Sequence, residues 1–138
     1  MSLKRVFVVD GARTPFLKVR GGPGPFAAAD LAMACARPLL ARQPFAPSDI
    51  DEAIVGCVIP APDEANIARI VALRLGCGKH VPAYTVQRNC ASGLQAVASA
   101  AERIALGYSN LILAGGTEAM SRAPIQWNAA MTGWLAAM

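Results

Sequence analysis

The sequence contains little histidine, few aromatic residues and no cysteine pair at metal-binding spacing. Among its 138 residues the one histidine is His80, and the four cysteines are Cys35, Cys57, Cys77 and Cys90. No two cysteines form a Cys-x-x-Cys pair, so neither a zinc site nor a disulfide framework is predicted. We expect no metal, no permanently bound cofactor, and free thiols in a reducing, cytoplasmic compartment.

Long hydrophobic runs and clusters of basic residues are also absent. The apolar runs stop well short of the ~20 residues that a membrane helix needs. The run after Lys4 and Arg5 ends at Asp10, too soon for a signal peptide. The 13 Lys and Arg residues give a net charge of +4, but they are scattered, and aromatic residues make up only 6%. We therefore expect neither a membrane partner nor a nucleic-acid partner.

Hydrophobic content, in contrast, is high at 54%, which indicates extensive burial. Continuous apolar runs predict buried strands at 5–9, 53–59, 83–87 and 110–114. Helical periodicity predicts helices at 27–41, 66–75 and 94–105. The order β-α-β-α-β-α-β is typical of an α/β fold with a mostly parallel sheet and right-handed crossovers. Ligands of such folds bind beyond the carboxyl ends of the strands.

Two of the predicted helices carry more specific expectations. In the first helix, Leu31, Ala34, Cys35 and Pro38 fall along one side. Pro38 predicts a kink or an early end, because proline removes a helical hydrogen bond. The third helix is apolar nearly all round, which predicts burial on most of its sides.

Residues 84–96 place Cys90 between a predicted strand and a predicted helix. Free N–H groups and the positive end of the dipole lie at a helix start, where they favour a thiolate and can stabilise an oxyanion. Most single cysteines are instead small packed hydrophobes, so this pattern leaves both interpretations open. Gly115 and Gly116 follow the last predicted strand, where they allow either close approach of a ligand or tight helix–strand packing.

Three segments resemble, in the same order, motifs of the thiolase family, the acetyl-CoA C-acyltransferases. They are residues 8–16 (VVDGARTPF), 87–96 (QRNCASGLQA) and 115–121 (GGTEAMS). The first resembles the family's opening strand and loop, the second its active-site cysteine motif, and the third its Gly-Gly-x-Glu-x-Met-Ser segment. The resemblance implies the α/β fold of the thiolase N-terminal half, without the C-terminal half.

The same resemblance implies an acyltransferase in which Cys90 is the catalytic nucleophile. Coenzyme A and acyl-CoA are then substrates, and an acyl-cysteine intermediate serves thiolysis of 3-ketoacyl-CoA or condensation of acetyl-CoA. These are reactions of fatty acid metabolism such as β-oxidation. The family resemblance also implies a homodimer or homotetramer for the complete protein. Two alternatives are a related condensing enzyme of the ketoacyl synthase type, and a catalytically inactive thiolase-like fragment acting only in assembly.

Compared with the family, the chain is expected to be an N-terminal portion. Residues 1–123 correspond to an incomplete N-terminal α/β domain, and residues 124–138 to the start of a truncated substrate-binding loop region. The family's catalytic histidine and second cysteine belong to the C-terminal half, so His80 is expected to be a loop residue and Cys35, Cys57 and Cys77 to be packing residues. We therefore expect the 138-residue chain alone to be inactive.

Overall fold

A three-stranded parallel sheet forms the centre of the computed structural model, which describes residues 3–19 and 21–138. Strand β1 (Glu52–Gly56) lies between β2 (Ala83–Val86) and β3 (Ile112–Gly116). Ala53 is the register partner of both Ala83 and Leu113. The strands expected in these three regions are confirmed, as is the mostly parallel α/β class, although β1 ends at Gly56 rather than at residue 59.

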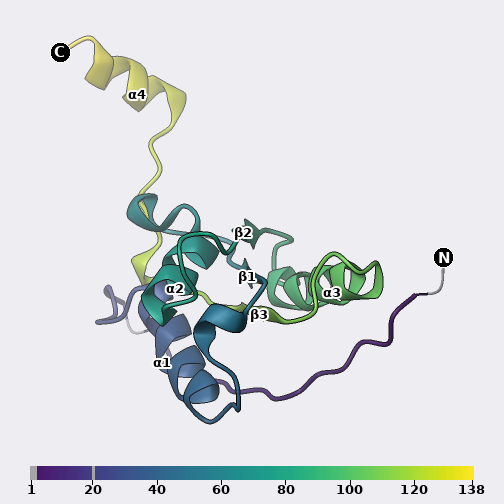
Figure 1. The fold of residues 1–138 in the computed structure, drawn as a ribbon. Coiled ribbons are helices and arrows are strands. Elements are labelled where there is room, and N and C mark those ends of the chain that lie inside the picture. The colour runs from purple at the N-terminus through teal and green to yellow at the C-terminus, as the bar shows by residue number, and fades with distance from the viewer. Residues whose placement is uncertain (1–2, 20) are drawn as a thin grey trace.

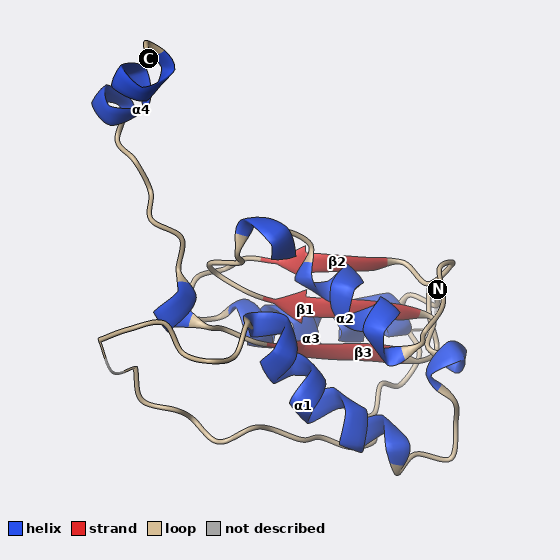
Figure 2. Ribbon diagram, turned by 90° about the vertical axis from the view of Figure 1, so that its left-hand side faces the viewer, coloured by secondary structure: helices blue, strands red, loops and turns tan. Residues whose placement is uncertain are grey.

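Helices cover both faces of this sheet (Figures 1 and 2). Helices α1 (Ala28–Ala41) and α2 (Ile67–Leu75) pack on one face, and α3 (Ser92–Ala105) packs on the other. Side chains alternate along β1, so Ala53 and Val55 face α1 and α2, whereas Ile54 faces α3. Every residue of β1 is buried, because it is the central strand and has a helix layer on each side.

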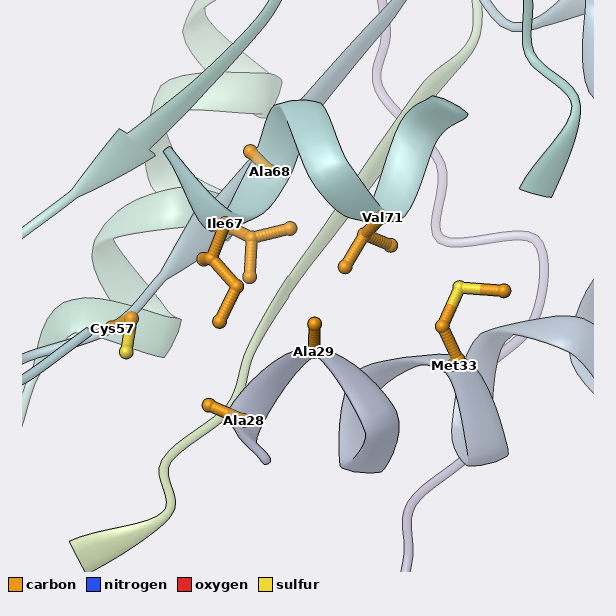
Figure 3. Close-up of a cluster of buried hydrophobic side chains, with 8 residues drawn as sticks. Ala28, Ala29, Met33, Cys57, Ile67, Ala68 and Val71 are labelled. Carbon is orange, nitrogen blue, oxygen red and sulfur yellow. The ribbon is translucent and has the colours of Figure 1, made fainter. Parts of the chain in front are cut away.

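The core is largest between α1, α2 and the sheet. Ile67 and Val71 of α2 meet Ala29 and Met33 of α1 there, close to Cys57 at the end of β1 (Figure 3). Burying each large aliphatic side chain of this kind stabilises the fold by about 1.5–3 kcal/mol. The ends of α2 are also well defined, since the Asn66 side chain accepts a hydrogen bond from the Arg69 N–H and Gly76 ends the helix at φ 86°.

The strand expected at residues 5–9 is wrong. This segment forms no strand in the described structure, and its side chains lie on the surface, with Val8 84% exposed. Polar contacts fix both of its ends: the Lys4 N–H donates to the Ala105 carbonyl at 3.0 Å, and the Asp10 carboxylate accepts two hydrogen bonds from Arg42. The apolar run identified a segment that favours burial, but these contacts hold it across the surface instead.

Expectations for two helices also need correction. Helix α1 continues through Pro38 to Ala41, so the early end is wrong. Its buried residues include Met33 and Leu40, while Ala34 and Pro38 are exposed. Helix α3 is not buried on most sides: Leu94 is 73% exposed on the side away from the sheet.

The remaining elements are short. In the described part of the chain, 3-10 turns span Pro47–Asp49, Pro62–Glu64 and Met120–Arg122. Helix α4 (Ala129–Ala136) follows an extended stretch and stands away from the sheet and its covering helices (Figures 1 and 2). Within the described residues, none of the helices combines the length and the apolar character that crossing a membrane requires.

Candidate active site

Cys90 lies in the turn that joins β2 to α3. Strand β2 ends at Val86 and α3 begins at Ser92, which confirms the expected strand–turn–helix position of this cysteine. The Cys90 residue is exposed, whereas Cys57 and Cys77 are buried and Cys35 is half-buried. This exposed cysteine therefore lies at the N-terminal end of a 14-residue helix, where the helix dipole is positive.

A single hydroxyl group organises the backbone of this turn. The Ser92 hydroxyl accepts a hydrogen bond from the Arg88 N–H at 2.8 Å and donates one to the Asn89 carbonyl at 2.7 Å. Asn89 has φ 48°, in the left-handed region that asparagine tolerates better than most residues. The Ala91 N–H closes the turn further by donating to the Arg88 carbonyl at 3.1 Å.

Glycines allow the start of α3 to lie directly on the strand ends. A Cβ atom at Gly56, the last residue of β1, would lie 2.3 Å from the Ser92 carbonyl carbon. A Cβ atom at Gly116, the last residue of β3, would lie 2.8 Å from the Gly93 Cα atom. Of the two interpretations left open for the Gly115–Gly116 pair, packing applies to Gly116. A Cβ atom at Gly115 would meet nothing within 4 Å.

The segment after β3 connects the loops around the strand ends. The Thr117 N–H donates to the Gly56 carbonyl at 2.9 Å, and its hydroxyl donates to the Ala28 carbonyl at 2.7 Å. The Ser121 hydroxyl accepts a hydrogen bond from the Gly24 N–H at 2.9 Å. The polar side chains of this motif thus join β1, α1 and the loop before α1 at one edge of the sheet.

Glu118 fixes the loop that follows β1. Its carboxylate accepts hydrogen bonds from the N–H groups of Val58 and Ile59, at 2.8 and 3.3 Å, and lies 3.5 Å from the Cys57 thiol. Burial, together with the charge of Glu118 and its hydrogen bond, raises the pKa of Cys57 to about 12. Cys57 is therefore a neutral packing residue, as the sequence predicted.

A cavity of about 560 Å³ lies beside this loop. Its lining residues are Val58, Ile59, Pro60, Gln87, Ala123, Pro124 and Gln126. Gln87 precedes Cys90 by three positions, so the cavity adjoins the segment leading into the Cys90 turn. A second cavity, of about 760 Å³, is lined by residues of α1 and of the loop before it, together with Arg74 of α2, and contains no residue of that turn.

The other titratable candidates lie elsewhere. His80 is exposed in the turn before β2, which agrees with its expected place in a loop. Burial raises the pKa of the Cys77 thiol, and burial likewise raises the pKa of Cys35. Among residues 3–19 and 21–138, no group of three or more His, Cys, Asp or Glu side chains is placed to hold a metal ion.

Sequence reasoning missed the contributions of Ser92 and Glu118. The sequence pattern assigned no role to Ser92, although a serine beside a turn commonly forms hydrogen bonds to nearby backbone groups and is a detectable signal. Glu118 had no such signal, because its partners Val58 and Ile59 are distant in the sequence. Only the pairing of β1 with β3 brings these residues together.

The comparisons with known proteins agree on one family. The model of the thiolase N-terminal domain matches residues 6–136. Beta-ketoadipyl-CoA thiolase from Acinetobacter baylyi is 42% identical over 124 residues, which are 88% of this chain and 31% of that protein. The chain thus spans about a third of the length of the curated relatives it matches.

Solved structures give the same answer for the fold. Human mitochondrial 3-ketoacyl-CoA thiolase matches with a TM-score of 0.77 at 36% identity, covering 84% of this chain and 30% of that one. A thiolase from Ascaris suum in complex with coenzyme A matches with a TM-score of 0.70 at 31% identity, covering 75% of this chain and 27% of that one. The chain therefore belongs to the thiolase family, and residues 6–136 match the family's N-terminal domain.

Proposed function

We propose that Cys90 is the acyl-accepting nucleophile of an acyl-CoA thiolase. The observation that carries this proposal is that Cys90 is an exposed residue just before the start of α3, while Cys57 and Cys77 are buried. Coenzyme A and acyl-CoA are the proposed substrates, and no permanently bound cofactor takes part. The relatives named as thiolases and the Ascaris suum thiolase in complex with coenzyme A support this choice.

The proposed chemistry has two halves. In thiolysis, the Cys90 sulfur attacks the 3-keto carbon of a 3-ketoacyl-CoA, and the bond between carbons 2 and 3 breaks. Acetyl-CoA leaves after carbon 2 gains a proton, and an acyl group remains on the sulfur. The thiolate of a second coenzyme A then attacks the acyl-cysteine, forming acyl-CoA and restoring the Cys90 thiolate. Condensation of two acetyl-CoA molecules is the reverse sequence.

The start of α3 has a proposed role in this chemistry. Each attack on a carbonyl creates an oxyanion, and backbone N–H groups at a helix start stabilise such a charge where it develops. The packing of the turn against Gly56 fixes these groups before the reaction. The proton donor and acceptor are proposed to come from outside the 138 residues, because His80, the one histidine, lies before β2.

The proposal extends to the organisation of the protein. Residues 1–123 are assigned to an incomplete N-terminal α/β domain, and residues 124–138, with α4, to the start of the substrate-binding loop region. In this assignment the chain alone performs no complete turnover. The complete protein is proposed to be a cytoplasmic homodimer or homotetramer that acts in fatty acid metabolism.

A single-turnover acylation experiment tests the central claim. The chain is incubated with acetyl-CoA and its intact mass is measured, with Cys90→Ala as the matched variant that lacks only the thiol. We expect one acetyl group on the wild-type chain, located on the peptide containing Cys90, and none on the variant. An equal adduct on the variant, or no adduct on either chain, would falsify the claim that this domain forms a competent nucleophile.

A further inference from the structure

The turn that carries Cys90 contains a second polar side chain, and this one is buried. Ser92 is 4% exposed, yet its hydroxyl has both a donor and an acceptor as partners. These partners, the Arg88 N–H and the Asn89 carbonyl, belong to the two residues immediately before Cys90. One hydroxyl thus connects the start of α3 to the backbone that leads into the cysteine.

The conformation that this hydroxyl contacts is an unfavourable one. Asn89 has φ 48°, a region that asparagine tolerates better than most residues but that still costs free energy, so contacts from its surroundings stabilise it there. The Ser92 hydroxyl and the Ser92 N–H both bind the Asn89 carbonyl, at 2.7 and 3.0 Å. Loss of the hydroxyl therefore removes one of two hydrogen bonds to this carbonyl and the partner of the Arg88 N–H.

The neighbouring strands limit how the turn can respond. The Ser92 backbone lies against Gly56, where a single added carbon atom would come within 2.3 Å. The helix start therefore cannot move closer to the sheet. Loss of the hydroxyl should therefore displace residues 88–90, which are exposed and have room to move. The start of α3 should stay in place, because it is packed against Gly56.

We propose that Ser92 is a positioning residue for Cys90. Its hydroxyl holds Asn89 in the left-handed conformation and thereby keeps the thiol over the positive end of α3. This inference rests on the proposed function only in taking the Cys90 thiol to be the nucleophile.

Charge-selective alkylation tests the inference on the chain itself. The rate of modification of each cysteine is followed by peptide mass with neutral iodoacetamide and with anionic iodoacetate. At the start of a helix the dipole favours the anionic reagent. In Ser92→Ala the ratio of the iodoacetate rate to the iodoacetamide rate at Cys90 is expected to fall about two- to fivefold. Cys57 and Cys77 report on the overall fold, because both are buried.

Three further variants separate positioning from general stability. Ser92→Thr and Ser92→Val have the same branched shape and differ in the hydroxyl, so the Thr variant should keep the wild-type ratio and the Val variant should lose it. Ser109→Ala removes another buried hydroxyl, whose contact is with Glu52 at 3.4 Å, and should leave the ratio unchanged.

The outcomes that overturn the inference are distinct from those that overturn the proposed function. An unchanged ratio in Ser92→Ala with Cys57 and Cys77 still protected overturns it, and so does an equal fall in Ser109→Ala. Exposure of the buried cysteines in both Ser92→Ala and Ser92→Val assigns Ser92 to overall stability and also overturns it. Because no acyl group is transferred in this experiment, a missing acetyl adduct on Cys90 affects the proposed function alone.

Discussion

The two faces of the sheet are built differently. On the face covered by α1 and α2, large side chains such as Ile67 and Val71 are at most 1% exposed. On the face covered by α3, the buried residues of the helix are Ser92, Ala96 and Ala100, all small. Small residues contribute little apolar area, but they let a helix approach a sheet closely. The first face therefore supplies most of the stability, and the second determines where the start of α3, and with it Cys90, is placed.

The largest expected effect comes from shortening a side chain on the α1/α2 face. Ile67→Ala leaves a cavity in the main core, which should lower the free energy of unfolding by about 2–5 kcal/mol. Leu94→Ala, on the outer side of α3, should change it by less than about 0.5 kcal/mol. Urea unfolding followed by circular dichroism measures both. Equal losses in the two variants would contradict the assignment of stability to one face.

Gly56→Ala tests whether close packing of α3 on the sheet determines the position of Cys90. The added carbon meets the Ser92 and Gly93 backbone, so α3 must move away from β1, at an expected cost of about 1–3 kcal/mol. Gly115→Ala is the matched control, because nothing lies within 4 Å of its added carbon. In Gly56→Ala the alkylation rate of Cys90 should also change. A wild-type rate there would show that the Cys90 turn is independent of this contact.

Glu118→Gln tests the connection between the ends of β1 and β3. A neutral acceptor binds the Val58 and Ile59 N–H groups less strongly, with an expected loss of about 1 kcal/mol. Burial is the main cause of the raised pKa of Cys57, and the Glu118 charge is the next, so the substitution should lower this pKa from about 12 without restoring an ordinary value. The ultraviolet absorbance of the thiolate, followed as the pH is raised and compared with that of Cys57→Ala, measures the change without requiring a reagent to reach the buried sulfur. Asp63→Asn removes an exposed charge that does not act on the Cys57 thiol, so it should leave this pKa unaltered.

The smallest effect concerns Asp51, at the opposite end of the strands. Hydrogen bonds from the Asn110 and Leu111 N–H groups lower the pKa of its carboxyl. A lowered pKa in the folded state stabilises the fold above the unfolded value of about 3.9, and this contribution is lost as the pH falls through the folded value. The stability difference between wild type and Asp51→Asn should therefore shrink between about pH 5 and pH 3. A constant difference across this range would show that protonation of Asp51 does not contribute to the loss of stability at low pH.

Much of this arrangement was predictable from local pattern. Runs of apolar residues located β1, β2 and β3, and the strand–turn–helix pattern placed Cys90 correctly, because both signals depend on near neighbours in the sequence. The assignment of Cys90 as the nucleophile stays a prediction. Its position was readable, but its use depends on chemistry that the acylation experiment addresses.

The failures share one physical cause. The segment 5–9 has the composition of a buried strand, and α3 is apolar nearly all round, but composition shows which residues favour burial and not which neighbour covers them. The same limit applies to polar contacts. Glu118 reaches Val58 across 60 positions of sequence, a distance that no local pattern encodes.

The packing of the start of α3 against Gly56 and Gly116 has a consequence for the order of folding. Gly56 and Gly116 are register partners at the ends of β1 and β3, and the chain between these strands includes the whole of β2 and α3. Pairing across so long a loop is slow compared with forming a helix or a turn, since loop closure must precede the gain from contacts. The start of α3 can pack against both glycines only when β1 and β3 have paired. We therefore expect the turn that contains Cys90 to reach its native conformation late in folding. A folding intermediate in which α1 and α2 are already packed would still lack this turn.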